Sequence, residues 1–486
     1  MNRWGRSTLW LAAAVVGLGT ACGAGMGGAF TAMPAGPQAA GVTTGGAQDI
    51  GLARAQVAAG QIPAPEAFVV EGLLSEHDID VQGEPCREVF CLRTATGVAP
   101  AIDTGRDAAF VVLGFSSAID LASFHRRSQN MAVVVDRSGS MDGEKIAAVR
   151  DALHRLVRQL GPRDRLAIVL FDDRVDVLVA STDLSQGAAH VEQMIDRIVA
   201  RGSTDIESGL AEGYRQVLGH SSQSRDDRVI LFTDALPNTG RTDEGSFLAL
   251  AGSQASRGVG LSVFGVGLDL GQDLAVSITR IPGANYFFLE NAQKVSTVFD
   301  EDFDLLVSPV AWDFDVVVRP ADGYRIAAAY GVPDWVEGEG DGSARIHVPT
   351  LFLSRNRGVI VLRMEAEGDQ QLSGQAVGMA QLSYREQRDG QQRRSSLEVT
   401  AIAPEQVVTE QPGVFAAVAL VNTALGLREA SRLARQAMPA ESLAMLDRVN
   451  ALLVQTDFGG ERQLVHDLRQ VIEARYPQPG AHVQLR

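Results

Sequence analysis

Positive charge is scarce relative to negative charge in this sequence of 486 residues. The chain has 43 Lys and Arg residues against 59 Asp and Glu residues, which gives a formal net charge of -16. Because such a chain repels phosphate backbones, we do not expect it to bind nucleic acid. Its hydrophobic content of 45% is sufficient for sizeable cores. The length is typical of about two to four domains.

Cysteine is also scarce, with three residues in the whole chain. Cys86 and Cys91 lie close together in the segment Cys-Arg-Glu-Val-Phe-Cys, and in an oxidising compartment such a pair can close a small disulfide loop. Metal ligation is the alternative, but no second Cys or His pair lies nearby to complete a tetrahedral site. We therefore predict a disulfide between Cys86 and Cys91.

The apolar stretch near the N-terminus, Leu9 to Leu18, is shorter than the about 20 residues that a membrane-spanning helix needs. Two arginines precede it and Gly19-Thr20-Ala21-Cys22 follows, in the order of a secretory signal. The small residues before Cys22 resemble the bacterial lipoprotein processing site, which implies that Cys22 is lipidated. Gly19 stands where that site usually has an aliphatic residue, so a simple cleaved signal is the alternative.

Residues 1–22 are thus the expected signal, and the protein is expected in the cell envelope, anchored by lipid at a bacterial membrane and facing the periplasm or the surface. Residues 23–60 are rich in Gly and Ala and almost without charge, which predicts a flexible linker. Residues 61–130 contain short apolar runs, such as 67–70 and 108–113, between turn residues. They are predicted to be a β-rich segment.

Sequence motifs of catalysis are not evident. The eight His residues are scattered, and neither a His-Glu-x-x-His helix nor a Gly-x-Ser-x-Gly motif is present. Asp172 and Asp173 follow an apolar run and are interpreted as turn residues between adjacent strands rather than as a general acid/base pair. We predict no catalytic residue and no enzymatic activity.

Residues 131–306 alternate between apolar runs and helical patterns. This order predicts an α/β region with a doubly wound, mostly parallel, Rossmann-like sheet. The expected strands are Met131–Val135, Leu166–Phe171, Val229–Phe232, Leu261–Val266 and Tyr286–Leu289, and the expected helices are Glu144–Leu160, Gly187–Val199, Ile206–Leu218, Glu244–Ser256 and Lys294–Leu306.

Oxygen-bearing side chains follow two of these expected strands. The segment Asp136-Arg137-Ser138-Gly139-Ser140 comes directly after the first strand, and Asp234 comes just after Val229–Phe232. In a parallel sheet the carboxyl ends of the strands converge on one rim, where ligands bind. Carboxylate and hydroxyl oxygens suit a magnesium-like cation. The sequence therefore predicts a metal site on this rim.

The same residues resemble the metal-ion-dependent adhesion site of the von Willebrand factor type A (VWA) domain. Asp136, Ser138 and Ser140 match its Asp-x-Ser-x-Ser motif, Thr204 matches its threonine before a helix, and Asp234 matches its last aspartate. The resemblance implies that the three hydroxyls bind the ion directly and that the two aspartates act mainly through water. It also implies Mg²⁺ as the cofactor, with Ca²⁺ or Mn²⁺ possible substitutes, and a partner protein whose Asp or Glu completes the coordination.

Each of these residues also has a purely local interpretation. Ser140 could cap the helix that follows it, Thr204 or Asp205 could cap the next helix, and Asp234 could satisfy loop amides. The joint match at five positions favours metal binding.

The remainder of the chain divides at about residue 403. Residues 307–403 contain short apolar runs between Gly, Asp and Pro, which predicts a second β-rich domain. Its strands are hypothesised to pair with those of 61–130, so that the α/β region is an insertion in a β-sandwich. Residues 404–486 show helical spacing and are predicted to pack as a helical hairpin over the sheet, with a partner-binding coil as the alternative.

The function predicted from these features is metal-dependent protein binding, in adhesion or complex assembly, by an exported and membrane-anchored protein. A metal-assisted hydrolase is the first alternative, although no general base is visible near the rim. A scaffold whose metal is purely structural is the second.

Overall fold

The computed structural model describes residues 41–44, 50–234, 244–267, 281, 284–289, 292–332, 335–337, 342–367, 376–386, 390–400 and 412–477. The expected signal sequence and Cys22 lie outside these residues. The prediction of a linker up to residue 60 is wrong at its C-terminal end. Strand β1 (Gly41–Thr44) pairs with a later strand, β13 (Ala344–Ser354), and residues Gly51–Ala58 form helix α1. The helix buries Leu52, Ala53 and Val57, so its alanine-rich sequence serves packing.

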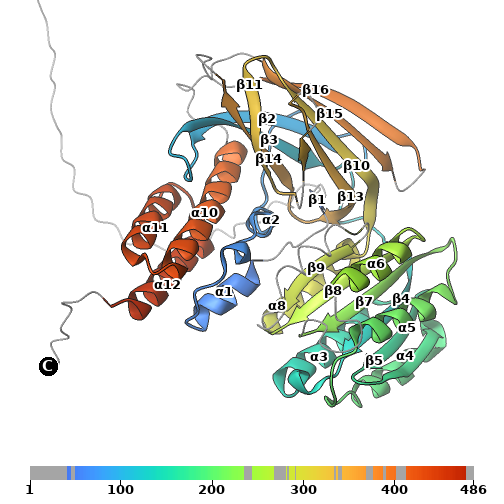
Figure 1. Ribbon diagram of the computed structural model, residues 1–486. Helices are drawn as coiled ribbons and strands as arrows, with labels where there is room; N and C mark the ends of the chain where they lie inside the picture. Colours follow the sequence, from blue (N-terminus) through green and yellow to red (C-terminus); the bar gives the residue numbers. More distant parts are fainter. Residues whose placement is uncertain are drawn as a thin grey trace, which may run out of the picture. The chain divides into compact units, whose positions relative to one another are not determined.

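The α/β region contains a six-stranded sheet in the order β6-β5-β4-β7-β8-β9 (Figure 1). All neighbouring strands are parallel except β5 and β6. The predicted doubly wound, mostly parallel sheet is therefore confirmed. The strands are β4 (Ser128–Asp136), β5 (Arg165–Phe171), β6 (Val175–Asp183), β7 (Arg225–Thr233), β8 (Val259–Val266) and β9 (Ala284–Leu289).

Helices pack on both faces of this sheet because successive side chains of a buried strand point to opposite sides. In β4, Val133 and Val135 belong to one apolar cluster, and Ala132 and Val134 to another. The first cluster includes residues of α3 and α4, and the second includes residues of α5 and α6. The helices are α3 (Glu144–Gln159), α4 (Leu184–Ile195), α5 (Ile206–Leu218), α6 (Glu244–Ala255), α8 (Ala292–Ser296) and α9 (Phe303–Leu306).

Two elements of this region differ from the prediction. Strand β6 was implied by the interpretation of Asp172 and Asp173 as a turn between strands, but its bounds were not predicted, because this edge strand exposes much of its length and mixes polar with apolar residues. The helix expected over Lys294–Leu306 is divided, since a π-helical segment at Thr297–Asp302 separates α8 from α9.

Strands from both sides of the α/β region form two further sheets, β11-β14-β3-β2 and β1-β13-β10-β15-β16, with β12 paired to β13. Strand β3 pairs with β14, with Gly114 opposite Val359, so the hypothesised pairing of the two flanking segments is confirmed. The α/β region is thus inserted between β3 and β10. The strands are β2 (Cys91–Pro100), β3 (Asp107–Ser116), β10 (Pro309–Pro320), β11 (Tyr324–Tyr330), β12 (Val336–Glu337), β14 (Val359–Ala366), β15 (Ala376–Glu386) and β16 (Gln392–Thr400).

Strand β3 joins two apolar cores. Val111 and Leu113 pack into a cluster shared with β10, β13 and β15, whereas Phe110 and Val112 pack against the C-terminal helices. These helices are α10 (Pro412–Arg435), α11 (Pro439–Leu453) and α12 (Gly459–Arg475). The expected packed helices are therefore present, three in number among the described residues. By length and composition α10 could cross a membrane, but 72% of its most apolar window is buried within the protein.

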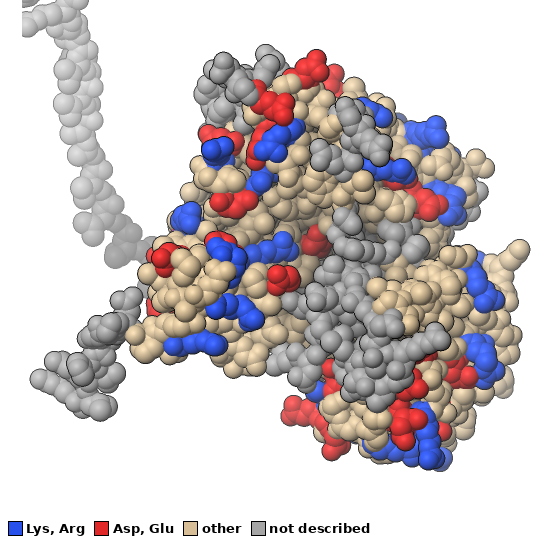
Figure 2. Space-filling model, viewed as in Figure 1, with Lys and Arg blue, Asp and Glu red and all other residues tan. Residues whose placement is uncertain are grey.

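The segment before β2 is helical where a strand was expected. Residues Pro65–Ala67 form a 3₁₀ turn and Val70–Ser75 form helix α2, so the apolar run at 67–70 is not a strand. Pro65, at the first position of the turn, supplies a backbone angle that suits a helical start. Ion pairs attach this segment to the sandwich. Arg357, for example, donates to the Asp78 carboxylate at 2.6 Å. Figure 2 shows that acidic and basic side chains are interspersed across the visible face of the protein.

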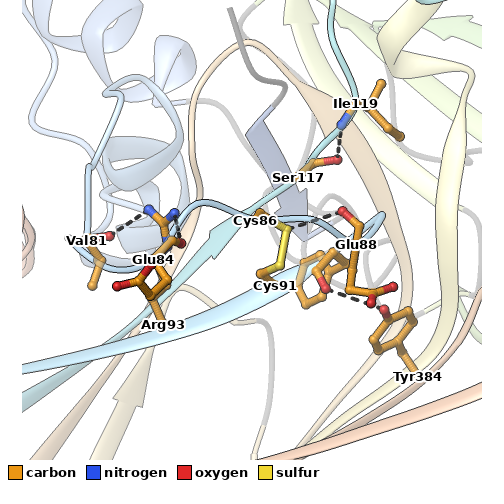
Figure 3. The surroundings of a disulfide bond; sticks show 10 residues. Val81, Glu84, Cys86, Glu88, Cys91, Arg93, Ser117, Ile119 and Tyr384 are labelled. Atoms are coloured by element: carbon orange, nitrogen blue, oxygen red, sulfur yellow. Dashed lines mark hydrogen bonds between the residues drawn. A yellow bond between two sulfur atoms is a disulfide. The ribbon is translucent and has the colours of Figure 1, made fainter.

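The predicted disulfide between Cys86 and Cys91 is present, with the two Cα atoms 5.7 Å apart (Figure 3). The short loop that it closes contains Phe90. The centroid of the Phe90 ring lies 5.2 Å from the ring centroid of Phe115 and 5.3 Å from that of Phe314. The Tyr384 hydroxyl also donates to the Phe90 carbonyl. The disulfide therefore holds an aromatic anchor of the sandwich core in place.

Replacement of both Cys86 and Cys91 by serine should lower the free energy of unfolding of the sandwich by about 2 kcal/mol, because the unfolded chain regains the entropy of a short loop. Trp312 and Trp335 both lie in the sandwich region, so their fluorescence during urea unfolding reports on it. An unchanged midpoint would show that packing alone retains Phe90.

Candidate functional site

The strand order reverses between β4 and β7, the two central strands of the α/β sheet. From β4 the chain continues outward through β5 and β6, and from β7 it continues through β8 and β9. Asp136 is the last residue of β4, and Asp234 directly follows β7. The two aspartates therefore flank the topological switch point, where open α/β sheets bind ligands.

Both oxygens of the Asp136 carboxylate accept hydrogen bonds from neighbouring residues. Oδ1 accepts from the backbone N–H of Ser138 at 2.8 Å, and Oδ2 accepts from the hydroxyl of Thr233 at 2.8 Å. The side chain is fully buried. Burial raises the pKa of Asp136 and the nearby charge of Asp234 raises it further, although the hydrogen bonds from Ser138 and Thr233 oppose the shift. Asp136 thus shapes the turn that carries the two serines.

The two serine hydroxyls converge. Ser138 Oγ lies 3.1 Å from Ser140 Oγ, and Ser140 donates to Asp234 Oδ1 at 2.8 Å. Ser140 is exposed, whereas the carboxylates of Asp136 and Asp234 are buried. Ser140 is thus the exposed hydroxyl of the pair, whereas Ser138 is buried together with the two carboxylates.

Backbone hydrogen bonds join the Thr204 loop to the serine turn. The N–H of Gly139 donates to the Gly202 carbonyl at 3.0 Å, and the N–H of Arg201 donates to the Arg137 carbonyl at 2.5 Å. Gly202 has a φ of +73°, which a residue with a side chain adopts only with strain. Thr204, two residues further along the same loop, is buried. All five residues predicted for the metal site thus belong to segments that meet at the carboxyl ends of β4 and β7.

The helix-capping alternatives for these residues are resolved by the geometry. The residue before α3 is Gly143, and no side chain caps that helix, so Ser140 is not its cap. Helix α5 is capped by Asp205, whose side chain accepts from the backbone N–H of Ser208 at 3.2 Å. Ser140 and Thr204 are therefore not needed as caps.

Two further site residues, Thr233 and Lys145, were not predicted from the sequence. Lys145 lies in the first turn of α3, and its Nζ donates to Asp234 Oδ2 at 2.6 Å. The ammonium group is thus a cation built into the site. A polar residue at the end of an apolar strand was the available signal for Thr233, whereas no local pattern marks the pairing of Lys145 with Asp234.

A buried ion-pair network lies behind the serine turn. The fully buried Asp172 carboxylate accepts from Arg137 Nε at 2.7 Å and from Arg201 Nε at 2.8 Å, and Asp172 also accepts from the N–H of Arg174. Both arginines also pair with Asp176. The predicted role of Asp172 as a turn residue between adjacent strands is confirmed, because β5 pairs with β6 directly around it. The network also holds the two loops of the site together.

Burial alone would raise the pKa of Asp172, but hydrogen bonds from Arg201 and Arg174, together with the charge of Arg137, lower it to about 2. A carboxylate with a lowered pKa stabilises the fold above its unfolded-state pKa, and this contribution is lost as the pH falls toward the folded-state value. The ion pairs of Asp172 should therefore weaken between about pH 4 and pH 2.

Asp172→Asn should lower the free energy of unfolding of the α/β region by about 2 kcal/mol, because it removes the buried carboxylate that Arg137 and Arg201 share and leaves the buried Arg137 only its pairing with Asp176. Thermal unfolding at pH 7 measures this loss, and the difference from the parent protein should shrink below about pH 4. The exposed neighbour Asp173, changed to Asn, is the matched control and should cost less than about 0.5 kcal/mol. Equal effects of the two variants would contradict the assigned role of Asp172.

The donor set fits a hard divalent cation. Hydroxyl oxygens at 3.1 Å from one another can serve one ion, and two buried carboxylates provide negative charge close by. Asp234 also orients the Ser140 hydroxyl, as residues behind a metal ligand commonly do. Histidine and cysteine, which softer metals prefer, are not among these residues.

Comparison with known proteins gives one family match. Residues 130–301 match the model of the von Willebrand factor type A domain. In solved structures, a von Willebrand factor type A protein from Catenulispora acidiphila superposes with a TM-score of 0.54 at 16% identity, over 79% of this chain and 91% of that one. At this identity the superposition shows the fold alone.

Curated relatives share similar regions. The uncharacterised protein YfbK of Escherichia coli is 27% identical over 52% of this chain and 45% of its own length. An uncharacterised Synechocystis protein is 25% identical over 54% of this chain and 63% of its own length. Inter-alpha-trypsin inhibitor heavy chain H1 of Mesocricetus auratus is 30% identical over 25% of this chain and 14% of its length. Each bacterial match therefore covers about half of this chain, and it covers 45% of the Escherichia coli protein and 63% of the Synechocystis protein.

Proposed function

Because residues 130–301 form a von Willebrand factor type A domain, we propose that the chain binds a protein partner through a divalent cation held at the carboxyl ends of β4 and β7. Domains of this family are generally interaction modules rather than enzymes. The proposed role is adhesion or complex assembly, and the proposed ion is Mg²⁺. The expected export and the lipid anchor at Cys22 belong to the same proposal and would hold the binding domain at a membrane.

The observation that carries the proposal is the separation of hydroxyl oxygens from carboxylates. Ser138 and Ser140 lie side by side with Ser140 exposed, and the carboxylates of Asp136 and Asp234 are fully buried beside them. In this proposal the hydroxyls of Ser138, Ser140 and Thr204 hold the ion directly. The two aspartates orient these hydroxyls or bond to water, so the ion is only partly neutralised.

A partly neutralised ion attracts an additional anion. When bound, Mg²⁺ supplies an electrophilic coordination position that accepts an oxygen ligand. A carboxylate from an Asp or Glu of the partner fits this position by charge and by chemistry. Among the described residues Ser140 is exposed, so such a side chain can reach its hydroxyl.

Replacing Ser138 and Ser140 together by alanine should abolish Mg²⁺ binding measured by calorimetry on the full chain, because two direct oxygen ligands are removed. Ser222 and Ser224 offer a matched control, since their hydroxyls also lie 3.1 Å apart but on an exposed turn. Alanine at both control positions should leave Mg²⁺ binding unchanged. Uptake of the ion by the Ser138/Ser140 variant with parental affinity would contradict the proposal.

Partner binding is tested by affinity capture from native membranes, with the parent protein and the Ser138/Ser140 variant each in Mg²⁺ and in chelator. A protein retained only by the parent in Mg²⁺, and released by free glutamate-rich peptide, is the expected result. Retention that survives chelation while thermal stability falls would favour a purely structural metal. Hydrolysis of generic esters or peptides that is lost in Asp136→Ala would favour an enzyme instead.

A further inference from the structure

Lys145 is notable because lysine is rare in this protein. Of the 43 Lys and Arg residues, only Lys145 and Lys294 are lysine. The ion pairs to the buried Asp172 beside the site use arginine, from the buried Arg137 and the half-exposed Arg201. The guanidinium group is a planar fork that fixes its partners, whereas an ammonium group is a compact charge on a flexible stem. The site therefore combines a network of arginines with one lysine, whose charge is carried by a flexible stem.

The ammonium group of Lys145 and the Ser140 hydroxyl share one carboxylate. Lys145 Nζ bonds to Asp234 Oδ2 at 2.6 Å, and Ser140 Oγ bonds to Asp234 Oδ1 at 2.8 Å. Asp234 is fully buried, whereas the Lys145 side chain is 25% exposed. An ion held by Ser140 is therefore close to a second positive charge, and the lysine has access to solvent.

The strand end opposite α3 leaves room for the stem of Lys145. Gly267 follows β8 with a φ of +86°, and a Cβ atom placed there would lie 2.5 Å from Lys145 Cε. Any larger residue at this position would both be strained and push the lysine away. The glycine thus lets the ammonium group reach Asp234.

We propose that Lys145 is a tethered cation that competes with the divalent ion for Asp234. This inference rests on the proposed metal-dependent function. The ammonium group neutralises the buried carboxylate when no ion is held, and its charge weakens binding of an ion at the serine hydroxyls. Since ion and partner affinities are linked reciprocally, a partner whose carboxylate binds to the ion raises the affinity of the site for the ion by the same factor. The site would therefore retain its ion best in the complex.

Lys145→Gln tests this competition on the full chain. The variant keeps a polar side chain of similar length but removes the charge, so Mg²⁺ affinity measured by calorimetry should rise about tenfold. In chelator, the melting temperature should fall by about 5 °C, because Asp234 loses its counter-charge, and added Mg²⁺ should restore it. Lys294→Gln is the matched control and should change neither quantity.

A second measurement uses the parent protein and does not depend on any variant. Lysine labelled with ¹³C at Cε gives two lysine signals, one for Lys145 and one for Lys294. Titration with Mg²⁺ should shift the Lys145 signal and leave the Lys294 signal in place, with Lys145→Gln identifying the signals. An unmoved Lys145 signal during saturable Mg²⁺ uptake would overturn the inference.

The outcomes separate the two proposals. Mg²⁺ binding that is equal or weaker in Lys145→Gln than in the parent overturns the competition but leaves the proposed function standing. No Mg²⁺ uptake by either protein overturns the proposed function and the competition together.

Discussion

Two buried carboxylates side by side at the centre of a sheet are the constraint on which this site depends. Asp136 and Asp234 end adjacent parallel strands, and neither side chain reaches solvent. Buried charge is costly unless it is hydrogen-bonded and compensated. Here Thr233, Ser138 and Ser140 donate to the carboxylates, and Lys145 supplies a charge. The Ser140 hydroxyl both donates to a buried carboxylate and is one of the proposed ligands of the cation, so one side chain serves the fold and the proposed function.

The surrounding fold holds these side chains in their relative positions. Backbone bonds from Gly139 and Arg201 join the two loops, and the network around Asp172 supports both from behind. The domain is inserted between β3 and β10 of a β-sandwich, so both of its ends are attached to one folded unit. Its last helical segment is connected to that unit by Arg355, which donates to Asp302 at 2.7 Å.

Much of this arrangement could be predicted from the sequence because the relevant signals are local. Apolar runs followed by Asp136 and Asp234 indicate buried strands that end at a polar rim, and helix α5 was predicted with its observed bounds, Ile206–Leu218. The pairing of β3 with β14 was a hypothesis, since strand pairing across a long insertion leaves only weak sequence signals. The structure supplied its register.

Other features could not be predicted because tertiary contacts decide them. Helix α1 has an alanine-rich sequence like that of a linker, but burial of Leu52 and Val57 orders it. The run at 67–70 is apolar because it packs beneath the C-terminal helices, and not because it is a strand. Lys145 was missed because its partner, Asp234, is 89 residues away in the chain. Ion pairs between distant segments have no local pattern.

The most direct test of the account is the location of the ion. Crystals of the full chain soaked in Mn²⁺ give an anomalous difference map that marks the metal independently of the refined protein atoms. The account predicts one strong peak bonded to Ser138 Oγ and Ser140 Oγ, at the carboxyl ends of β4 and β7. A saturating soak with no peak there, or a peak bound only elsewhere, would contradict it.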